Sequence, residues 1–305
     1  MWKIGIHNCY WLGSGCDDLY SALEASSKAG VDVYEMNTGV FFQLKEEELK
    51  DFRAYAEKLG LGLSVNGGFD LSNDISADDP AIRAKGIAAA RKILDGMYIV
   101  GAHSWSGINY GAWKRVPNPA YAFPRTEKER VRALSIASLK EIIKIAEDRD
   151  VTMCFEVVNR YEQFLCNTAA EGVAMAEEVG SPRCKVLLDT YHMNIEEDSM
   201  IDAIHYAAQH KKIGEIHMGE SNRRVPGTGK TNLDWPGIFG AIREIGYDGL
   251  ITMEPFLVEG LPISSRICVW RDLSQRADTQ GFIENVRRGA AFIRSFEHVP
   301  KAADC

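Results

Sequence analysis

The chain has 305 residues, of which 46% are hydrophobic and 26% are charged, a balance typical of globular proteins that bury a large apolar core. Its net charge of −8 argues against a nucleic-acid or anionic-membrane partner, since both need clustered Lys and Arg. No apolar run approaches the roughly 18 residues of a membrane span. We therefore expect no nucleic-acid and no membrane partner, whereas a small neutral substrate is compatible with the charge.

Strand-like and helix-like segments alternate eight times along the chain. The predicted strands begin near Lys3 (KIGIH), Val31 (VDVYEMN), Leu61 (LGLSVNG), Met97 (MYIVGAHSW), Val151 (VTMCFEVV), Lys185 (KVLLDT), Ile213 (IGEIHMG) and Gly249 (GLITMEP). The predicted helices run from Asp17 to Ala29, Lys45 to Leu59, Pro80 to Leu94, Thr126 to Asp148, Thr168 to Val179, Asp198 to Gln209, Asp234 to Ile245 and Asp278 to Phe296. Glycines that suit C-terminal caps follow four of these helices, at Gly30, Gly60, Gly180 and Gly246.

Repeated strand and helix units predict a parallel sheet with right-handed crossovers. Eight units favour an α/β fold in which residues 1–305 form one single (β/α)8 TIM barrel domain. The alternative is an open doubly wound sheet, but no GxGxxG motif follows the first strand. The longest insertion, at about residues 106–125, is rich in aromatic residues and predicts a lid or an oligomer contact. Its Tyr110 and Trp113 would shape the outer pocket.

The seven cysteines include no CxxC pair, and their odd number and scattered spacing suggest a reducing compartment. Cys154 and Cys184 lie in predicted strands, where a thiol usually behaves as a small buried hydrophobe. The start, MWKIGIHNCYW, lacks the basic and apolar segments of a signal peptide. We expect a cytoplasmic protein.

Four polar residues stand near the C-terminal ends of the last four predicted strands: Glu156, Asp189, His217 and Glu254. Each follows an apolar stretch, where a buried polar group is costly unless it is paired or bound. Each alone could be a separately satisfied polar group. A barrel of parallel strands, however, brings such ends together at the rim where its active sites lie. Three carboxylates and one imidazole favour Mn²⁺, Mg²⁺ or Co²⁺ over a thiolate-bound Zn²⁺.

Two carboxylates beside a metal suit a particular reaction. A metal that chelates a carbonyl and its neighbouring hydroxyl acidifies the C–H bond between them. Glu156 and Glu254, on the fifth and eighth strands, could remove this proton and return it to the opposite face, inverting one carbon. Three polar residues in the following loops could point into the same cavity: Glu162, His192 and Arg223. A surface salt bridge for Glu162 and a solvated position for Arg223 are equally open interpretations.

The segments EVVNRYE, LDTYHMN, HMGESNRRVPGTG, MEPF and VWRDL resemble the ketose 3-epimerases, the D-tagatose and D-allulose (D-psicose) 3-epimerase group of the xylose-isomerase-like barrels. The resemblance covers nearly the whole chain. It implies a metal-dependent isomerase that inverts C3 of a free ketose, such as D-fructose/D-allulose or D-tagatose/D-sorbose. It also implies a homodimer or a homotetramer.

The resemblance further implies residue roles. One divalent ion, Mn²⁺ in the first place and otherwise Co²⁺ or Mg²⁺, would bind Glu156, Asp189, His217 and Glu254, and the two glutamates would form the acid–base pair. Further positions would contact the sugar: Glu162, His192 and Arg223 around C1 to C3, Trp113 and Gly107 near its far end, and Asn66 and Gly67 along the pocket.

One position departs from the family pattern. The family usually has Phe or Tyr where this chain has His7, at a position that contacts the sugar. An imidazole could donate a hydrogen bond to a hydroxyl, or it could fill the volume of the usual ring. His7 therefore leaves the preferred sugar undetermined but does not change the expected reaction.

Other functions remain as alternatives. An aldose–ketose isomerase or a sugar-phosphate epimerase could use the same barrel. A phosphate would call for a helix N-terminus or a basic cluster, and the adjacent Lys114 and Arg115 should point apart. A barrel nuclease would need more histidine ligands and a basic face. A sugar-binding protein without activity would not need two carboxylates beside a metal.

Overall fold

Eight strands form a closed barrel in sequence order, in a computed structural model that describes residues 1–229 and 231–297. The strands are β1 (Lys3–His7), β2 (Val33–Asn37), β3 (Gly62–Asn66), β4 (Ser104–Gly107), β5 (Thr152–Val157), β6 (Cys184–Asp189), β7 (Ile213–Met218) and β8 (Leu250–Met253). This order confirms the predicted (β/α)8 TIM barrel fold, because each strand is joined to the next by a segment that contains a helix.

Eight longer helices correspond to the predicted ones: α1 (Leu19–Ala29), α3 (Glu46–Lys58), α4 (Pro80–Val100), α5 (Arg125–Asp148), α6 (Ala169–Val179), α8 (Met200–Gln209), α9 (Trp235–Glu244) and α11 (Thr279–Ser295). The sequence did not predict four short ones: η1 (Asn8–Trp11), α2 (Val40–Gln43), α7 (Thr190–Glu196) and α10 (Pro262–Arg266). None of the helices in the described ranges combines the length and the apolarity that a membrane span requires.

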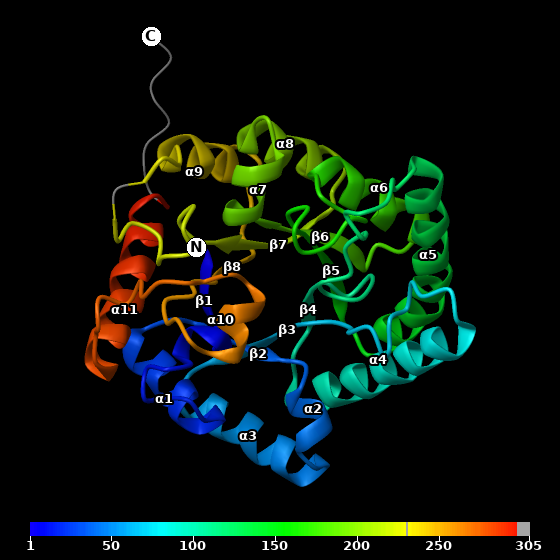
Figure 1. Cartoon of the computed structure of the whole chain (residues 1–305). Coiled ribbons are helices and arrows are strands. Elements are labelled where there is room, and N and C mark those ends of the chain that lie inside the picture. Colours follow the sequence, from blue (N-terminus) through cyan, green and yellow to red (C-terminus); the bar gives the residue numbers. More distant parts are fainter. Residues whose placement is uncertain (230, 298–305) are drawn as a thin grey trace. The chain divides into compact units, whose positions relative to one another are not determined.

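The chain divides into two compact units, of which the first comprises Met1–Glu35, Ala56–Gly62 and the part from His217 onward. Here β1 pairs in parallel with both β2 and β8. Helices α1 and α11 come from opposite ends of the sequence and lie side by side (Figure 1). They are joined by Arg287, whose guanidinium donates to the carbonyl of Lys28 at 2.8 Å. Tyr10 ties η1 to α11, since its hydroxyl donates to the carbonyl of Phe282 at 2.9 Å.

The second unit comprises Met36–Tyr55 and Leu63–Ile216, and in it β3, β4, β5 and β6 pair consecutively in parallel. Neighbouring helices α4, α5 and α6 pack beside one another (Figure 1). Helix α6 approaches β5 and β6 closely at Gly172. A Cβ there would lie 2.8 Å from Val157 Cγ2 and 3.0 Å from Val186 Cγ1, so glycine permits this packing.

The predicted start of the fourth strand near Met97 is wrong. Helix α4 continues through Val100, and β4 begins only at Ser104. Met97 and Val100 are buried on the same helix face as Ile93. Gly101 then ends the helix with a φ of 71°. A short apolar run rich in β-branched and aromatic residues fits either element, and here the helical period prevails.

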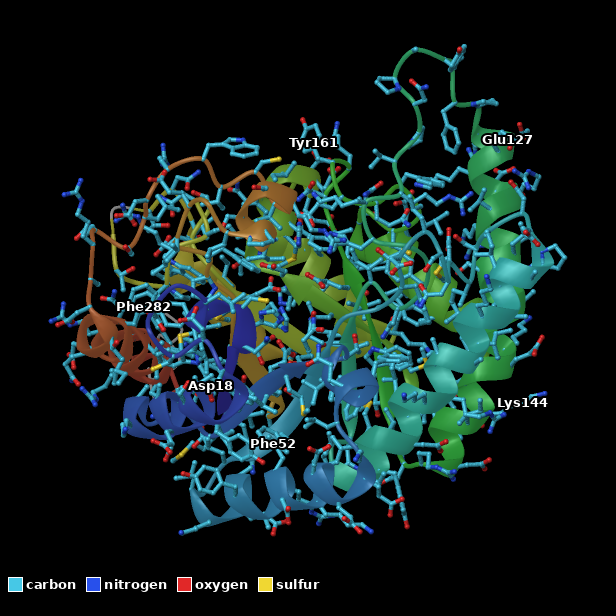
Figure 2. The ribbon with its side chains drawn as sticks, turned by 60° about the horizontal axis from the view of Figure 1, so that its bottom comes forward. Asp18, Phe52, Glu127, Lys144, Tyr161 and Phe282 are labelled. Carbon is cyan, nitrogen blue, oxygen red and sulfur yellow. The ribbon has the colours of Figure 1, made fainter. Side chains whose placement is uncertain are left out.

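The segment predicted as a lid has two different halves. Tyr110 in its first half is fully buried, and its hydroxyl donates to the carbonyl of Glu156 at 2.9 Å. The prediction that Tyr110 shapes the outer pocket is therefore wrong, because this ring supports β5 from within the unit. In the second half, Tyr121 and Phe123 are 75% and 40% exposed. Figure 2 shows the chain before α5 reaching outward past Glu127, which lies in the helix's first turn. A lid role for this outer half stays a prediction.

Candidate metal centre and active site

The four predicted ligands all lie at the C-terminal ends of successive strands, β5 to β8. They are all buried, with exposed fractions of 6% for Glu156, 1% for Asp189, 0% for His217 and 7% for Glu254. Each offers one oxygen or nitrogen atom, and together they form a group that could hold a metal ion. This donor set of three carboxylates and one imidazole fits a hard divalent cation, as the sequence predicted.

In the second unit, Asp189 ends β6 and also caps α7, where its carboxylate accepts from the N–H of Tyr191 at 2.7 Å. The first turn of α7 then places His192 on the same side, because residues three apart are neighbours on a helix. Its Nε2 lies 3.3 Å from Glu156 Oε1 and 3.7 Å from Asp189 Oδ2. His192 is therefore in contact with both proposed ligands of this unit.

Asn159, which was not among the residues predicted from the sequence, determines which ring nitrogen of His192 carries the hydrogen. The N–H of Asn159 donates to His192 Nδ1 at 3.1 Å, and its side-chain amide lies 2.8 Å from the same atom. A backbone N–H can only donate, so Nδ1 is an acceptor and the imidazole is neutral. The ring hydrogen then lies on Nε2 and is directed at Glu156.

The polar chain continues from Asn159 to Glu162 and Trp113. Glu162 Oε1 accepts from the Asn159 amide at 3.3 Å, and Oε2 accepts from Trp113 Nε1 at 2.8 Å. Glu162 is only 6% exposed, so its interpretation as a surface salt bridge is wrong. The neighbouring cations diverge, as expected: Lys114 Nζ lies 3.9 Å from Glu162, whereas Arg115 Nη1 lies 2.8 Å from Asp74.

Gly107 and Asn66 lie at adjacent strand ends in the same unit. Gly107 ends β4 with a φ of 106°, and a Cβ there would lie 2.7 Å from the N of Gly67. Any larger residue would separate these two strand ends. Asn66 ends β3, and its amide donates to Ser106 Oγ at 3.2 Å. The ends of β3 and β4 thus lie close together and are joined by this hydrogen bond.

In the first unit, Glu254 is surrounded by positive and hydrogen-bonding groups. Its Oε2 accepts from Arg223 Nη1 at 2.9 Å and lies 3.7 Å from His217 Nδ1, while its Oε1 lies 4.0 Å from His7 Nε2. Burial raises the pKa of Glu254, but the Arg223 guanidinium and the two imidazoles outweigh burial and hold this pKa well below its ordinary value. Glu254 is therefore ionised at neutral pH, the form in which a carboxylate can accept a proton.

Arg223 owes its position to a tight turn between β7 and α9. Its φ is 66°, its N–H donates to the carbonyl of Glu220 at 2.8 Å, and its carbonyl accepts from Phe256 at 2.9 Å. The guanidinium carbon also lies 5.2 Å from the centre of the Phe256 ring. Arg223 is 5% exposed, so its interpretation as a solvated loop residue is wrong.

His7 ends β1 beside the same ring and is 3% exposed. Its Nδ1 accepts from the N–H of Cys9 at 3.3 Å. The ring hydrogen therefore lies on Nε2, the atom that faces Glu254. His7 thus offers a hydrogen-bond donor on the side of Glu254.

Comparisons with known proteins show which family the chain resembles. A family model described as a xylose isomerase-like TIM barrel matches residues 23–295. The chain is 37% identical to a D-psicose 3-epimerase of Agrobacterium fabrum, over 96% of this chain and 98% of that protein. It is 34% identical to an L-ribulose 3-epimerase of a Methylomonas species, over 90% of this chain and 93% of that one.

A crystal structure of a D-psicose 3-epimerase in the presence of D-fructose matches with a TM-score of 0.89 at 36% identity, covering 96% of this chain and 99% of that one. Both the sequence relatives and the solved structure therefore match over nearly the whole length. The chain belongs to the xylose isomerase-like TIM barrel family and, within it, to the ketose 3-epimerases.

Proposed function

We propose that this protein is a metal-dependent ketose 3-epimerase that interconverts free ketoses differing at C3, such as D-fructose and D-allulose. The observation that carries the proposal is the pair of buried glutamates, Glu156 and Glu254, each held by its own nitrogen donors at the end of β5 or β8. Two separately held carboxylates suit a reaction in which one takes a proton and the other gives one.

Glu156, Asp189, His217 and Glu254 would hold one divalent cation, Mn²⁺ in the first place and otherwise Co²⁺ or Mg²⁺. The oxygen-rich donor set supports this choice. When bound, such a cation stabilises the negative charge that develops on the substrate oxygens during deprotonation.

In one direction Glu254 takes the proton from C3, and the electron pair of that C–H bond moves into the neighbouring carbonyl to give an enediolate. Protonated Glu156 then delivers its proton to the opposite face of C3. In the reverse direction the two residues exchange roles. Arg223 and the Nε2–H of His192 orient the carboxylates throughout, so that each reaches one face.

Six residues would contact the sugar. Glu162, His192 and Arg223 would hold the oxygens around C1 to C3, Trp113 and Gly107 would lie toward the far end, and His7 would face a hydroxyl. The interlocked hydrogen bonds of Trp113, Glu162 and His192 support a preorganised contact surface. A single barrel domain, a homodimer or homotetramer and a cytoplasmic location complete the proposal.

Proton exchange in D₂O tests the reaction directly. D-fructose, D-allulose, D-tagatose and L-ribulose would each be followed by NMR with and without Mn²⁺. We expect deuterium at C3 of the epimeric product, with little label in the remaining substrate early in the reaction, because the delivering glutamate exchanges its proton with solvent.

Three outcomes would overturn the proposal. Label at C1 or C2 with an aldose product would indicate an aldose–ketose isomerase. Turnover of phosphorylated ketoses alone would indicate a sugar-phosphate epimerase. Binding of ketoses without any exchange would indicate a sugar-binding protein.

A further inference from the structure

Glu35 is a fully buried carboxylate that the predicted site does not include. It lies in β2, is 0% exposed, and both of its oxygens lie 3.3 Å from His217 Nε2. Burying a carboxylate costs several kcal/mol unless it is paired and hydrogen-bonded. Its contact with the imidazole of His217 therefore stabilises a group that would otherwise be costly at this position.

We propose that Glu35 is a positioning residue that fixes His217 in the tautomer whose Nδ1 binds the metal; this rests on the metal centre proposed above. Nε2 lies within hydrogen-bond distance of Glu35, at 3.3 Å, whereas Nδ1 lies 3.7 Å from Glu254, so the ring hydrogen belongs on Nε2. Nδ1 then keeps its lone pair. This atom lies on the side of Glu254, at 3.7 Å from Oε2 of that second ligand.

The other buried histidines of the described residues show that this arrangement is specific. In His7 and His192, Nδ1 accepts from the backbone N–H groups of Cys9 and Asn159, so Nε2–H faces a glutamate. In His217 the orientation is reversed, and the hydrogen faces Glu35. Two imidazoles are thus set as donors, and the third is set as a ligand.

The consequence is a gain in metal affinity. A carboxylate that accepts from a ligating histidine orients the ring and raises its basicity, and removing such a partner typically weakens metal binding about 10- to 100-fold. Without Glu35 the ring hydrogen could move to Nδ1, and a metal would first have to displace it.

Two measurements test this inference on the whole protein. Mn²⁺ affinity of the metal-free protein would be measured by calorimetry for wild type, Glu35→Gln and Glu35→Leu. We expect about a 10- to 100-fold higher Kd for Glu35→Leu and a smaller change for Glu35→Gln, because an amide oxygen still accepts a hydrogen bond. ¹⁵N correlation spectra of the imidazoles would show the hydrogen of His217 on Nε2 in metal-free wild type.

Asp74→Asn is the matched control. Asp74 is 2% exposed and pairs with Arg115, so its substitution also neutralises a buried carboxylate but should leave the Kd for Mn²⁺ unchanged. Wild-type affinity in folded Glu35→Leu would overturn the inference and leave the metal centre intact. If Glu35→Leu does not fold, a hydrogen on Nδ1 of wild-type His217 would overturn it equally. Failure of wild type to bind Mn²⁺ or Co²⁺ would instead refute the metal centre itself.

Discussion

Glu156 and Glu254 lie in different electrostatic surroundings. Glu254 contacts the permanent cation of Arg223, whereas Glu156 contacts a neutral imidazole, that of His192, which can only donate its Nε2–H. A guanidinium favours the ionised carboxylate more strongly than a neutral donor does. Two carboxylates kept in unlike environments can hold opposite protonation states, and an epimerase that uses one base and one acid needs that difference.

Replacing either glutamate by glutamine should stop the reaction without unfolding the protein. Because proton transfer by a positioned side chain contributes about 10²- to 10⁴-fold, we expect kcat to fall at least that far in Glu156→Gln and in Glu254→Gln. Turnover would be measured at saturating Mn²⁺, with circular dichroism to confirm folding. Glu129→Gln, on the exposed side of α5, serves as a control that should keep wild-type activity. Near wild-type rates in either site variant would rule out the two-carboxylate mechanism.

The donor on His7 should set a preference among ketoses. A neutral hydrogen bond contributes about 1 kcal/mol, so His7→Phe should raise KM about fivefold for a ketose whose hydroxyl accepts from Nε2, with little change in kcat. His7→Gln, which keeps a donor, should lie closer to wild type. KM values would be compared for D-fructose, D-tagatose and L-ribulose. An unchanged ranking of the three sugars in His7→Phe would mean that the imidazole only fills space.

At the scale of the elements, the alternation of strands and helices was predictable because apolar period and capping residues agree over most of the chain. Thr168 and Asp234, the first residues of two predicted helices, are the N-caps of α6 and α9. The start of β4 was missed because an apolar run does not distinguish the end of a buried helix from a strand. Gly101, which ends α4 in the left-handed conformation, was the available signal.

The site residues that could be predicted from the sequence are polar residues at the end of an apolar strand. Glu156, Asp189, His217 and Glu254 satisfy this rule. Glu35 satisfies a related one, because it is the one charged residue of β2, yet its partner is distant in sequence. Asn159 is recognisable only once the turn after β5 is known. Residues that act by holding another side chain need the tertiary structure to be identified.

The strands also bury thiols whose reactivity can be tested. Burial raises the pKa of three thiols from an ordinary 9.0 to about 12: those of Cys154 in β5, Cys184 in β6 and Cys166 in the loop between these strands. We expect iodoacetamide at pH 8 to modify the exposed Cys268 and to spare these three until the protein is unfolded. Cys305 lies outside the described residues. Peptide mass spectrometry after timed labelling would measure this, and early labelling of Cys154 would contradict its burial.

The same pKa shifts predict how stability changes in alkali. As the pH rises above 9, the thiol of Cys154 ionises first in the unfolded chain, because its pKa in the folded protein is raised to about 12. Its contribution to stability is therefore complete below pH 9 and is lost progressively up to about pH 12. The free energy of unfolding should therefore decline across this window. Cys154→Ala should flatten the decline, while a slope equal to that of wild type would assign the loss to other groups.

At the scale of the whole molecule, the proposed metal would couple the stability of the barrel to its function. The four proposed ligands belong to four successive strands, β5 to β8. Without a cation, the carboxylates rely on nearby cations and donors such as Arg223 and His192. Binding should therefore favour the native state over the unfolded chain, which cannot gather these groups.

Removing the metal should lower the melting temperature. A ligand present at 100 times its Kd stabilises the native state by about 2.7 kcal/mol. For a chain of this size that is a shift of roughly 4 °C. Calorimetric melting of the protein with excess Mn²⁺ and after treatment with a chelator would measure the difference. Asp189→Asn, which removes one ligand oxygen but keeps the cap of α7, should make the two curves converge. Identical curves for the wild-type protein with and without chelator would show that the barrel gains no stability from a cation at the ends of strands β5 to β8. The proposed metal centre would then have to be abandoned.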